Sequence, residues 1–138
     1  MTLSLDTNVL IELVRGYDGL VRQRLSQAVM VETPLVASLI VLHELWLGCE
    51  LHRDPVGELK RVEVVLRKVP IEPFDETDMR MTATVKAKLR LLGQAIGAYD
   101  LLIAGQALAR GWTVVTANTR EFARIDGLNV IDWTIPSD

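Results

Sequence analysis

Short apolar runs alternate along this chain with longer segments in which apolar residues recur every three or four positions. The short runs predict buried strands, and the longer spacing predicts helices that pack on them. The predicted strands are Thr2–Asp6, Leu35–Ser38, Val69–Glu72, Trp112–Thr116 and Asn129–Ile131. The predicted helices are Asn8–Arg15, Gly19–Met30, Leu39–His52, Asp54–Lys68, Asp75–Leu92 and Tyr99–Arg110.

Residues that favour helix ends support these boundaries. Asp54-Pro55 marks a helix start, because proline is favoured in the first turn, and Gly93 and Gly111 follow two predicted helix ends. Continuous apolar strands that alternate with helices predict an α/β sandwich around a parallel sheet. Ligands of such sheets bind beyond the carboxyl ends of the strands.

Length and composition fit one compact domain covering residues 1–138, with 49% hydrophobic and 24% charged residues. The longest apolar stretch, Leu35–Leu47, contains His43 and Glu44 and is shorter than a membrane span of about 18 residues. The N-terminus lacks the basic start of a signal peptide. With Cys49 as the single cysteine, we expect a soluble cytoplasmic protein without a disulfide and a packed, inert thiol.

The net charge of −3 argues against a nucleic-acid ligand held by bulk electrostatic attraction. It leaves open a nucleic-acid site that depends on a metal ion held by acids.

Polar residues lie where a parallel sheet would place a ligand. Asp6 closes the first strand, Asn118 follows the strand that ends at Thr116, and Asp100 opens an almost wholly apolar helix. Each also has a structural explanation. Asp6 and Asp100 are suited to capping helices, and Asn118 with Glu121 matches a capping arrangement.

Glu44 is harder to explain structurally. It shares a predicted helix face with Ile40, Leu47 and Leu51, and no Arg or Lys lies within one helical turn. A carboxylate on an apolar face carries a desolvation cost of several kcal/mol unless a partner compensates it. A bound cation or a tertiary salt bridge would do so, and the sequence favours the cation.

Carboxylates with an amide oxygen, and no cluster of histidines and cysteines, select an ion such as Mg²⁺ or Mn²⁺. His43 and His52 do not have the spacing of zinc ligands. Ions of this kind, held by acids, commonly serve phosphate chemistry.

At this point the sequence resembles the PIN-domain family, and within it the VapC-type toxins of toxin–antitoxin pairs. The matching segments run nearly from end to end. They are Leu5–Ile11 (LDTNVLI), Leu42–Gly48 (LHELWLG), Ile96–Ala104 (IGAYDLLIA) and Val115–Phe122 (VTANTREF), followed by Gly127-Leu128 and Trp133.

The resemblance implies a three-layer α/β/α sandwich with a central parallel sheet, and a Mg²⁺ or Mn²⁺ site. Asp6 and Asp100 would be direct ligands of the ion, and Glu44 would complete the cluster directly or through water. The fourth position, often acidic in the family, is Asn118, which adds no charge. The remaining residues implied for the second shell or for substrate contact are Thr7, Thr116, Arg120 and Glu121, the last as a possible substitute acid.

The resemblance also implies a toxin that cleaves single-stranded or loop RNA with a metal-activated water. It further implies homodimers and a groove near Trp46 that receives a cognate antitoxin, although helical spacing alone makes Trp46 a core residue. Few of the basic residues are expected to touch RNA; the candidates are Arg15, Arg22, Arg24, Lys86, Arg90, Arg120 and Arg124.

Three other interpretations fit less well. A phosphoacceptor receiver domain needs paired acids after its first strand and a Lys-Pro, and a haloacid-dehalogenase-like phosphatase needs Asp-x-Asp. This chain has Asp6-Thr7-Asn8 and no Lys-Pro. A PIN-like module that binds proteins without catalysis gains some support because Asn118 stands where the family often has a fourth acid.

Overall fold

The computed structural model describes residues 1–16 and 19–136, so the last two residues of the predicted domain lie outside the described part. The strands are β1 (Leu3–Leu5), β2 (Leu35–Ser38), β3 (Ile71–Glu72), β4 (Thr113–Val115) and β5 (Asn129–Ile131). The helices are α1 (Thr7–Val14), α2 (Leu20–Met30), α3 (Leu39–Leu51), α4 (Pro55–Leu66), α5 (Glu76–Leu91), α6 (Ala98–Arg110) and α7 (Thr119–Phe122).

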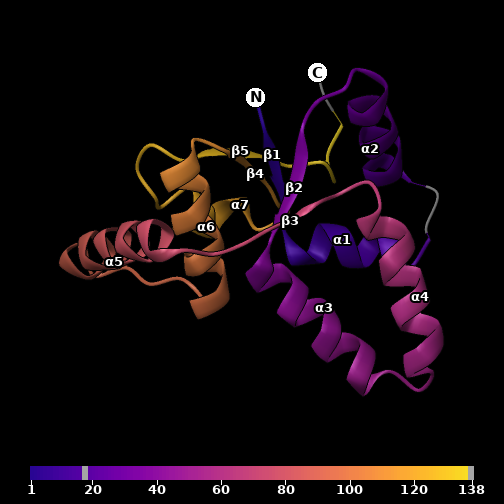
Figure 1. Cartoon of the computed structure of the whole chain (residues 1–138). Coiled ribbons are helices and arrows are strands. Elements are labelled where there is room, and N and C mark those ends of the chain that lie inside the picture. Colours follow the sequence, from indigo (N-terminus) through magenta and orange to yellow (C-terminus); the bar gives the residue numbers. More distant parts are fainter. Residues whose placement is uncertain (17–18, 137–138) are drawn as a thin grey trace.

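The strands form one parallel sheet in the order β3-β2-β1-β4-β5. In Figure 1, α5 and α6 lie on one side of the sheet, and α1, α2 and α4 lie on the other. The predicted α/β/α sandwich with a parallel sheet is therefore confirmed. The order of the strands reverses at β1: β2 and β3 are added on one side of it, and β4 and β5 on the other. Parallel sheets commonly bind ligands beside such a reversal, and the region beyond the carboxyl ends of these strands is here called the crevice.

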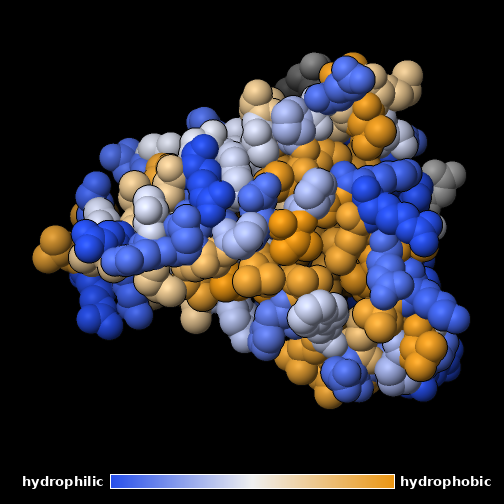
Figure 2. Space-filling view, in the orientation of Figure 1, coloured by the Kyte–Doolittle hydropathy of each residue, from blue (hydrophilic) through white to orange (hydrophobic). Residues whose placement is uncertain are grey.

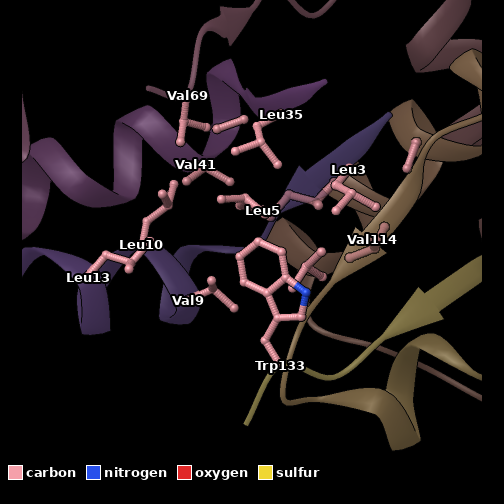
Figure 3. Close-up of a cluster of buried hydrophobic side chains, with 14 of the residues drawn as sticks. Leu3, Leu5, Val9, Leu10, Leu13, Leu35, Val41, Val69, Val114 and Trp133 are labelled. Atoms are coloured by element: carbon pink, nitrogen blue, oxygen red, sulfur yellow. The ribbon is translucent and has the colours of Figure 1, made fainter. Parts of the chain in front are cut away.

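The core forms around β1. Leu5 and Val114 are fully buried, and Figure 3 shows the ring of Trp133 beside Leu5 and Val9, between α1 and β4. Both faces of the central strands are covered by helices, which is why their sequences are continuous apolar runs instead of alternating ones. Burying this surface supplies the main force that holds the sheet and helices together.

The pair of helices α5 and α6 contains a buried ion pair that the sequence did not indicate. Asp78 is fully buried and accepts hydrogen bonds from Arg110 Nε and Nη2 at 3.0 and 2.9 Å. Burial is the largest effect and opposes the charge on Asp78, but the hydrogen bonds from Arg110 and Asp75 and the positive charge of Arg110 together outweigh it and lower the pKa of the carboxyl. Asp78 also closes a capping box with Asp75.

Several details differ from the sequence-based expectation. The short helix α7 was not predicted, and the strand before α5 contains only Ile71 and Glu72. Cys49 is buried as expected, and burial, followed by the charges of Glu58 and Glu50, raises the pKa of its thiol. Within the described residues, no helix is long and apolar enough to cross a membrane.

Candidate active site

Asp6 lies at the carboxyl end of β1, where the crevice opens. Its side chain is 3% exposed; Oδ1 accepts the backbone N–H of Thr7 at 2.8 Å, and Oδ2 accepts the hydroxyl of Thr116 at 2.7 Å. Asp6 is thus the N-cap of α1, as one interpretation of the sequence proposed. Burial raises the pKa of Asp6, and the two hydrogen bonds act against that rise. The cap leaves further lone pairs on both oxygens, so capping and metal binding are compatible.

Glu44 lies on α3 and is joined to the end of β1 through Thr7. The buried hydroxyl of Thr7 donates to Glu44 Oε1 at 2.7 Å. Within the described part of the chain, Glu44 takes part in no salt bridge, so the salt-bridge explanation is wrong. The apolar face predicted around it is wrong too. Leu47 and Leu51 are 48% and 78% exposed, because α3 buries the face that carries Val41, Leu42, Leu45 and Cys49.

Asp100 is the third residue of α6 and does not cap it. The N-cap is Gly97, which has no side chain to accept a hydrogen bond, so the capping explanation of Asp100 is wrong. Burial, followed by the negative charge of Asp6, raises the pKa of Asp100 to about 6; Glu121 and Glu44 add to the rise. The negative charges of Asp6 at the end of β1, of Glu44 on α3 and of Glu121 on α7 therefore all act on Asp100.

Asn118 connects Asp100 to Glu121. Its amide nitrogen donates to Asp100 Oδ2 at 3.1 Å and to Glu121 Oε2 at 2.8 Å. Asn118 is the N-cap residue of α7, but its side chain makes no capping bond, so the predicted capping arrangement is wrong in its contacts. Instead the amide donor separates two like charges and offsets part of their repulsion.

The threonines that follow β1 and β4 hold the cluster together. Thr116 donates its hydroxyl to Asp6 and accepts the backbone N–H of Asn118 at 3.0 Å. Thr7 supports Asp6 through its backbone and Glu44 through its hydroxyl. The structure thus brings together every acid and threonine predicted for the site. Arg120 is different: it is exposed and has no hydrogen bond or ion pair with another described residue.

The donors around the crevice fit a hard divalent cation. Within the described residues, none of the salt bridges involves Asp6, Glu44, Asp100 or Glu121, so their charge is uncompensated. The described residues also contain no group of three or more His, Cys, Asp and Glu side chains already placed to hold a metal ion. An ion would therefore take few direct ligands from this arrangement and keep several waters, as Mg²⁺ commonly does.

An open groove of about 740 Å³ leads away from Glu44 between α1, α3 and α4. Arg15, Arg53 and Arg61 line it, and only Arg15 was among the basic residues proposed for RNA. Several other basic residues proposed for RNA contact form hydrogen bonds to the protein backbone instead. Arg22, Arg24 and Arg124 donate to the carbonyl oxygens of Leu13, Ile135 and Ala95.

A second groove, of about 730 Å³, separates α3 from α4 and is lined by Trp46, Leu47, Val56 and Leu59. Trp46 is 52% exposed, so its assignment to the core by helical spacing is wrong. Figure 2 shows hydrophobic side chains gathered over the middle and lower part of this face, where α1 and α3 run, whereas the outer side of α4 is mostly hydrophilic. An exposed apolar groove of this kind commonly marks a protein contact.

Comparison with known proteins assigns the family. The model of the PIN domain matches residues 3–128. This chain belongs to the PIN-domain family. The PIN chain is 34% identical over 129 residues to the tRNA(fMet)-specific endonuclease VapC of Salmonella typhimurium, covering 94% of this chain and 96% of the relative. It is 32% identical over 130 residues to the enzyme of the same name from Shigella flexneri, covering 94% and 96%.

Solved structures agree with the PIN assignment. DNA-bound VapBC from Salmonella typhimurium superposes with a TM-score of 0.89 at 33% identity, covering 96% of this chain and 98% of that one. VapBC2 from Rickettsia felis, bound to a promoter fragment, superposes with a TM-score of 0.90 at 27% identity, covering 96% and 99%. The expected resemblance to VapC-type PIN domains is thus confirmed.

Proposed function

We propose that this PIN-domain protein is a divalent-metal-dependent endoribonuclease and the toxin of a toxin–antitoxin pair. The observation that carries the proposal is the convergence of Asp6, Glu44 and Asp100, from three different elements, on one crevice without a cationic side chain to balance them. The endonuclease and ribonuclease names of relatives that match nearly the full chain support the reaction class.

In this proposal Asp6 and Asp100 are direct ligands of Mg²⁺ or Mn²⁺, with Glu44 acting directly or through water. When bound, the ion lowers the pKa of an attacking water and balances charge on the scissile phosphodiester. Thr116 and Thr7 fix the orientations of Asp6 and Glu44, the acids that would hold the ion. Asn118 holds Asp100 and Glu121 in place with its two N–H bonds, so Glu121 is the nearest substitute for the missing fourth acid.

The substrate class in this proposal is single-stranded or loop RNA. The crevice lies beside the groove lined by Arg15, Arg53 and Arg61. Arg61 is paired with Glu58 and Asp54, so the charges of Arg15 and Arg53 are the ones that suit a phosphate backbone in a chain of net charge −3. In this proposal, the bound metal ion and these arginines attract the RNA, in place of the overall positive charge that most nucleic-acid-binding proteins use.

Cleavage of single-stranded RNA by the purified protein tests this proposal. We expect cleavage with Mg²⁺ or Mn²⁺, none with EDTA, and none from the Asp6→Asn or Asp100→Asn protein. Glu50→Gln is the matched control, because Glu50 is an exposed acid on α3 and makes no contact with the cluster. Undiminished cleavage by the Asp100→Asn protein would contradict the proposed mechanism. Absence of cleavage by wild type would favour the alternative, a PIN-like module that binds proteins without catalysis.

The partner in this proposal is an antitoxin that docks in the groove between α3 and α4. The solved VapBC structures that superpose on this chain support such a partner. Trp46 is exposed in the free chain and would become buried on binding, as the aromatic anchors of strong interfaces do. Co-expression with the neighbouring gene product should give a complex without nuclease activity. Trp46→Ala should weaken the complex by about 2 kcal/mol or more, and no binding at all would contradict the toxin assignment alone.

The family also favours a homodimer, which light scattering of the purified protein would measure.

A further inference from the structure

Two aromatic rings contact each other between α3 and α6, the helices that carry Glu44 and Asp100. His43 on α3 and Tyr99 on α6 have ring centroids 5.5 Å apart, with an angle of 52° between the ring planes. Each directly precedes an acid of the crevice, Glu44 and Asp100. The two helices that supply these acids therefore also supply an aromatic pair beside them.

The ring pair is poorly explained as a structural contact. His43 is exposed, and Tyr99 is 43% exposed, so neither ring fills the core. Within the described residues, no hydrogen bond or ion pair is formed by the imidazole nitrogens or by the phenol hydroxyl. A tilted ring pair on the surface contributes little to folding, because most of each ring face still contacts water.

We propose that His43 and Tyr99 form a stacking platform for a nucleobase of the RNA, next to the phosphodiester that is cut. This inference rests on the proposed nuclease function and adds the residues that hold the substrate base. Aromatic side chains, histidine included, are the usual partners of unstacked bases in proteins that bind single strands.

The charge of the crevice explains why stacking is useful here. The acids beside the rings repel phosphate until a cation is bound, and the whole chain carries a net charge of −3. Stacking does not depend on charge, so the platform binds the base without adding to or opposing the electrostatics of the metal site. A base in a duplex is already stacked on its neighbours, so the platform also favours single strands.

Neighbouring side chains on a helix point in different directions, but the α-carbons of His43 and Glu44, like those of Tyr99 and Asp100, are only about 3.8 Å apart. A nucleotide whose phosphate reaches the acids therefore has its base near the platform. A stacked base is held equally in the ground state and in the transition state. Loss of the platform should then raise KM and leave kcat nearly unchanged.

Steady-state cleavage of a short RNA without self-complementarity tests the platform in Mg²⁺. Tyr99→Leu and His43→Leu should each raise KM about ten-fold, the size that one stacked base contributes, with kcat changed less than about two-fold. Tyr99→Phe keeps the ring and should behave as wild type. Leu51→Ala is the matched control, since Leu51 is another exposed apolar side chain on α3 and lines neither groove, and its KM should not change.

A direct measurement uses the Asp100→Asn protein, which should bind RNA without cutting it. A fluorescent adenine analogue beside the cleavage site should be quenched on binding, and Tyr99→Leu in that background should abolish the quenching. If wild type cleaves RNA and the Tyr99→Leu KM stays within about two-fold, or if Leu51→Ala raises KM equally, the platform is wrong and the nuclease proposal survives. No cleavage by wild type would instead remove the nuclease proposal.

Discussion

The hydroxyl of Thr7 donates a hydrogen bond to Glu44 Oε1 at 2.7 Å, across 37 positions of sequence. Thr7 is the first residue of α1, and its backbone N–H is already used by Asp6. One residue therefore orients two acids of the cluster, one through its main chain and one through its side chain. The acid on α3 is thereby tied to the carboxyl end of β1.

Thr7→Val should weaken the site while preserving the fold. Valine has nearly the same shape but no hydroxyl, so Glu44 loses its donor and its fixed orientation. Loss of such an outer partner typically costs about ten- to one-hundred-fold in metal affinity or activity. Titration with Mn²⁺ and cleavage assays would measure the loss, and Thr7→Ser should retain most of both. Equal values for Thr7→Val and wild type would show that the hydrogen bond has no role in the site.

Metal binding should depend on pH through Asp100, whose pKa is raised to about 6 by burial and by the charge of Asp6. A divalent ion needs the ionised carboxylate, so below pH 6 it must displace a proton, and affinity should fall up to about ten-fold per pH unit. Calorimetric titration with Mn²⁺ at several pH values between about pH 5 and pH 7 would measure this fall in affinity. A flat affinity across this range would contradict the raised pKa.

The same shift affects folding of the metal-free protein. The folded pKa of Asp100 lies above its ordinary value of 3.8, so the folded state favours the protonated acid. The stability that this proton contributes is present below pH 3.8 and is lost as pH rises through about 6. Thermal melts in EDTA should show this loss in wild type and a smaller one in Asp100→Asn. An equal slope in both proteins would assign the pH dependence to other groups.

Asn118→Asp should have opposite effects without and with metal. The amide nitrogen donates to both Asp100 and Glu121, so a carboxylate would remove these bonds and add repulsion. The metal-free protein should lose roughly 1–3 kcal/mol, a typical cost for losing hydrogen bonds to charged groups. Mn²⁺ should bind more tightly, because the site gains an anionic oxygen. Melts in EDTA and titration with Mn²⁺ would measure the two effects, and unchanged metal affinity would place Asn118 outside the site.

Arg110→Leu should destabilise the fold without changing the metal site. It leaves the fully buried Asp78 unpaired, which typically costs about 3–5 kcal/mol. Since Arg110 lowers the pKa of Asp78, the stability that the pair contributes is present at neutral pH and is lost as pH falls below the ordinary carboxyl value of 3.8. Denaturant unfolding at neutral pH would measure the loss. Replacing both partners, Asp78→Leu with Arg110→Leu, should recover part of it.

The fold could be predicted well from the sequence because its signals are local. Every strand and each of the six longer helices correspond to an apolar pattern within a short stretch of sequence. Continuous apolar strands also imply a parallel sheet covered on both faces. The acids proposed for the site were also suggested by the sequence, since Asp6 ends a predicted strand and Asp100 begins a predicted helix, at the edge where parallel sheets bind ligands. Short α7 was missed because four residues carry too little periodicity to stand out.

The contacts of those residues depended on tertiary structure. Helical spacing suggested that Trp46, Leu47 and Leu51 were buried, but which face of α3 is covered depends on where α1, α4 and α6 pack. Asp78 looked like an ordinary first-turn acid until the packing of α6 brought Arg110 to it, 32 positions away. By itself, the sequence determined which residue types stand at the carboxyl ends of the strands, because that follows from local pattern. Only the tertiary structure decided that Thr7 reaches Glu44, that Asn118 separates Asp100 from Glu121, and that His43 meets Tyr99, because each contact joins elements that only the packed sheet brings together.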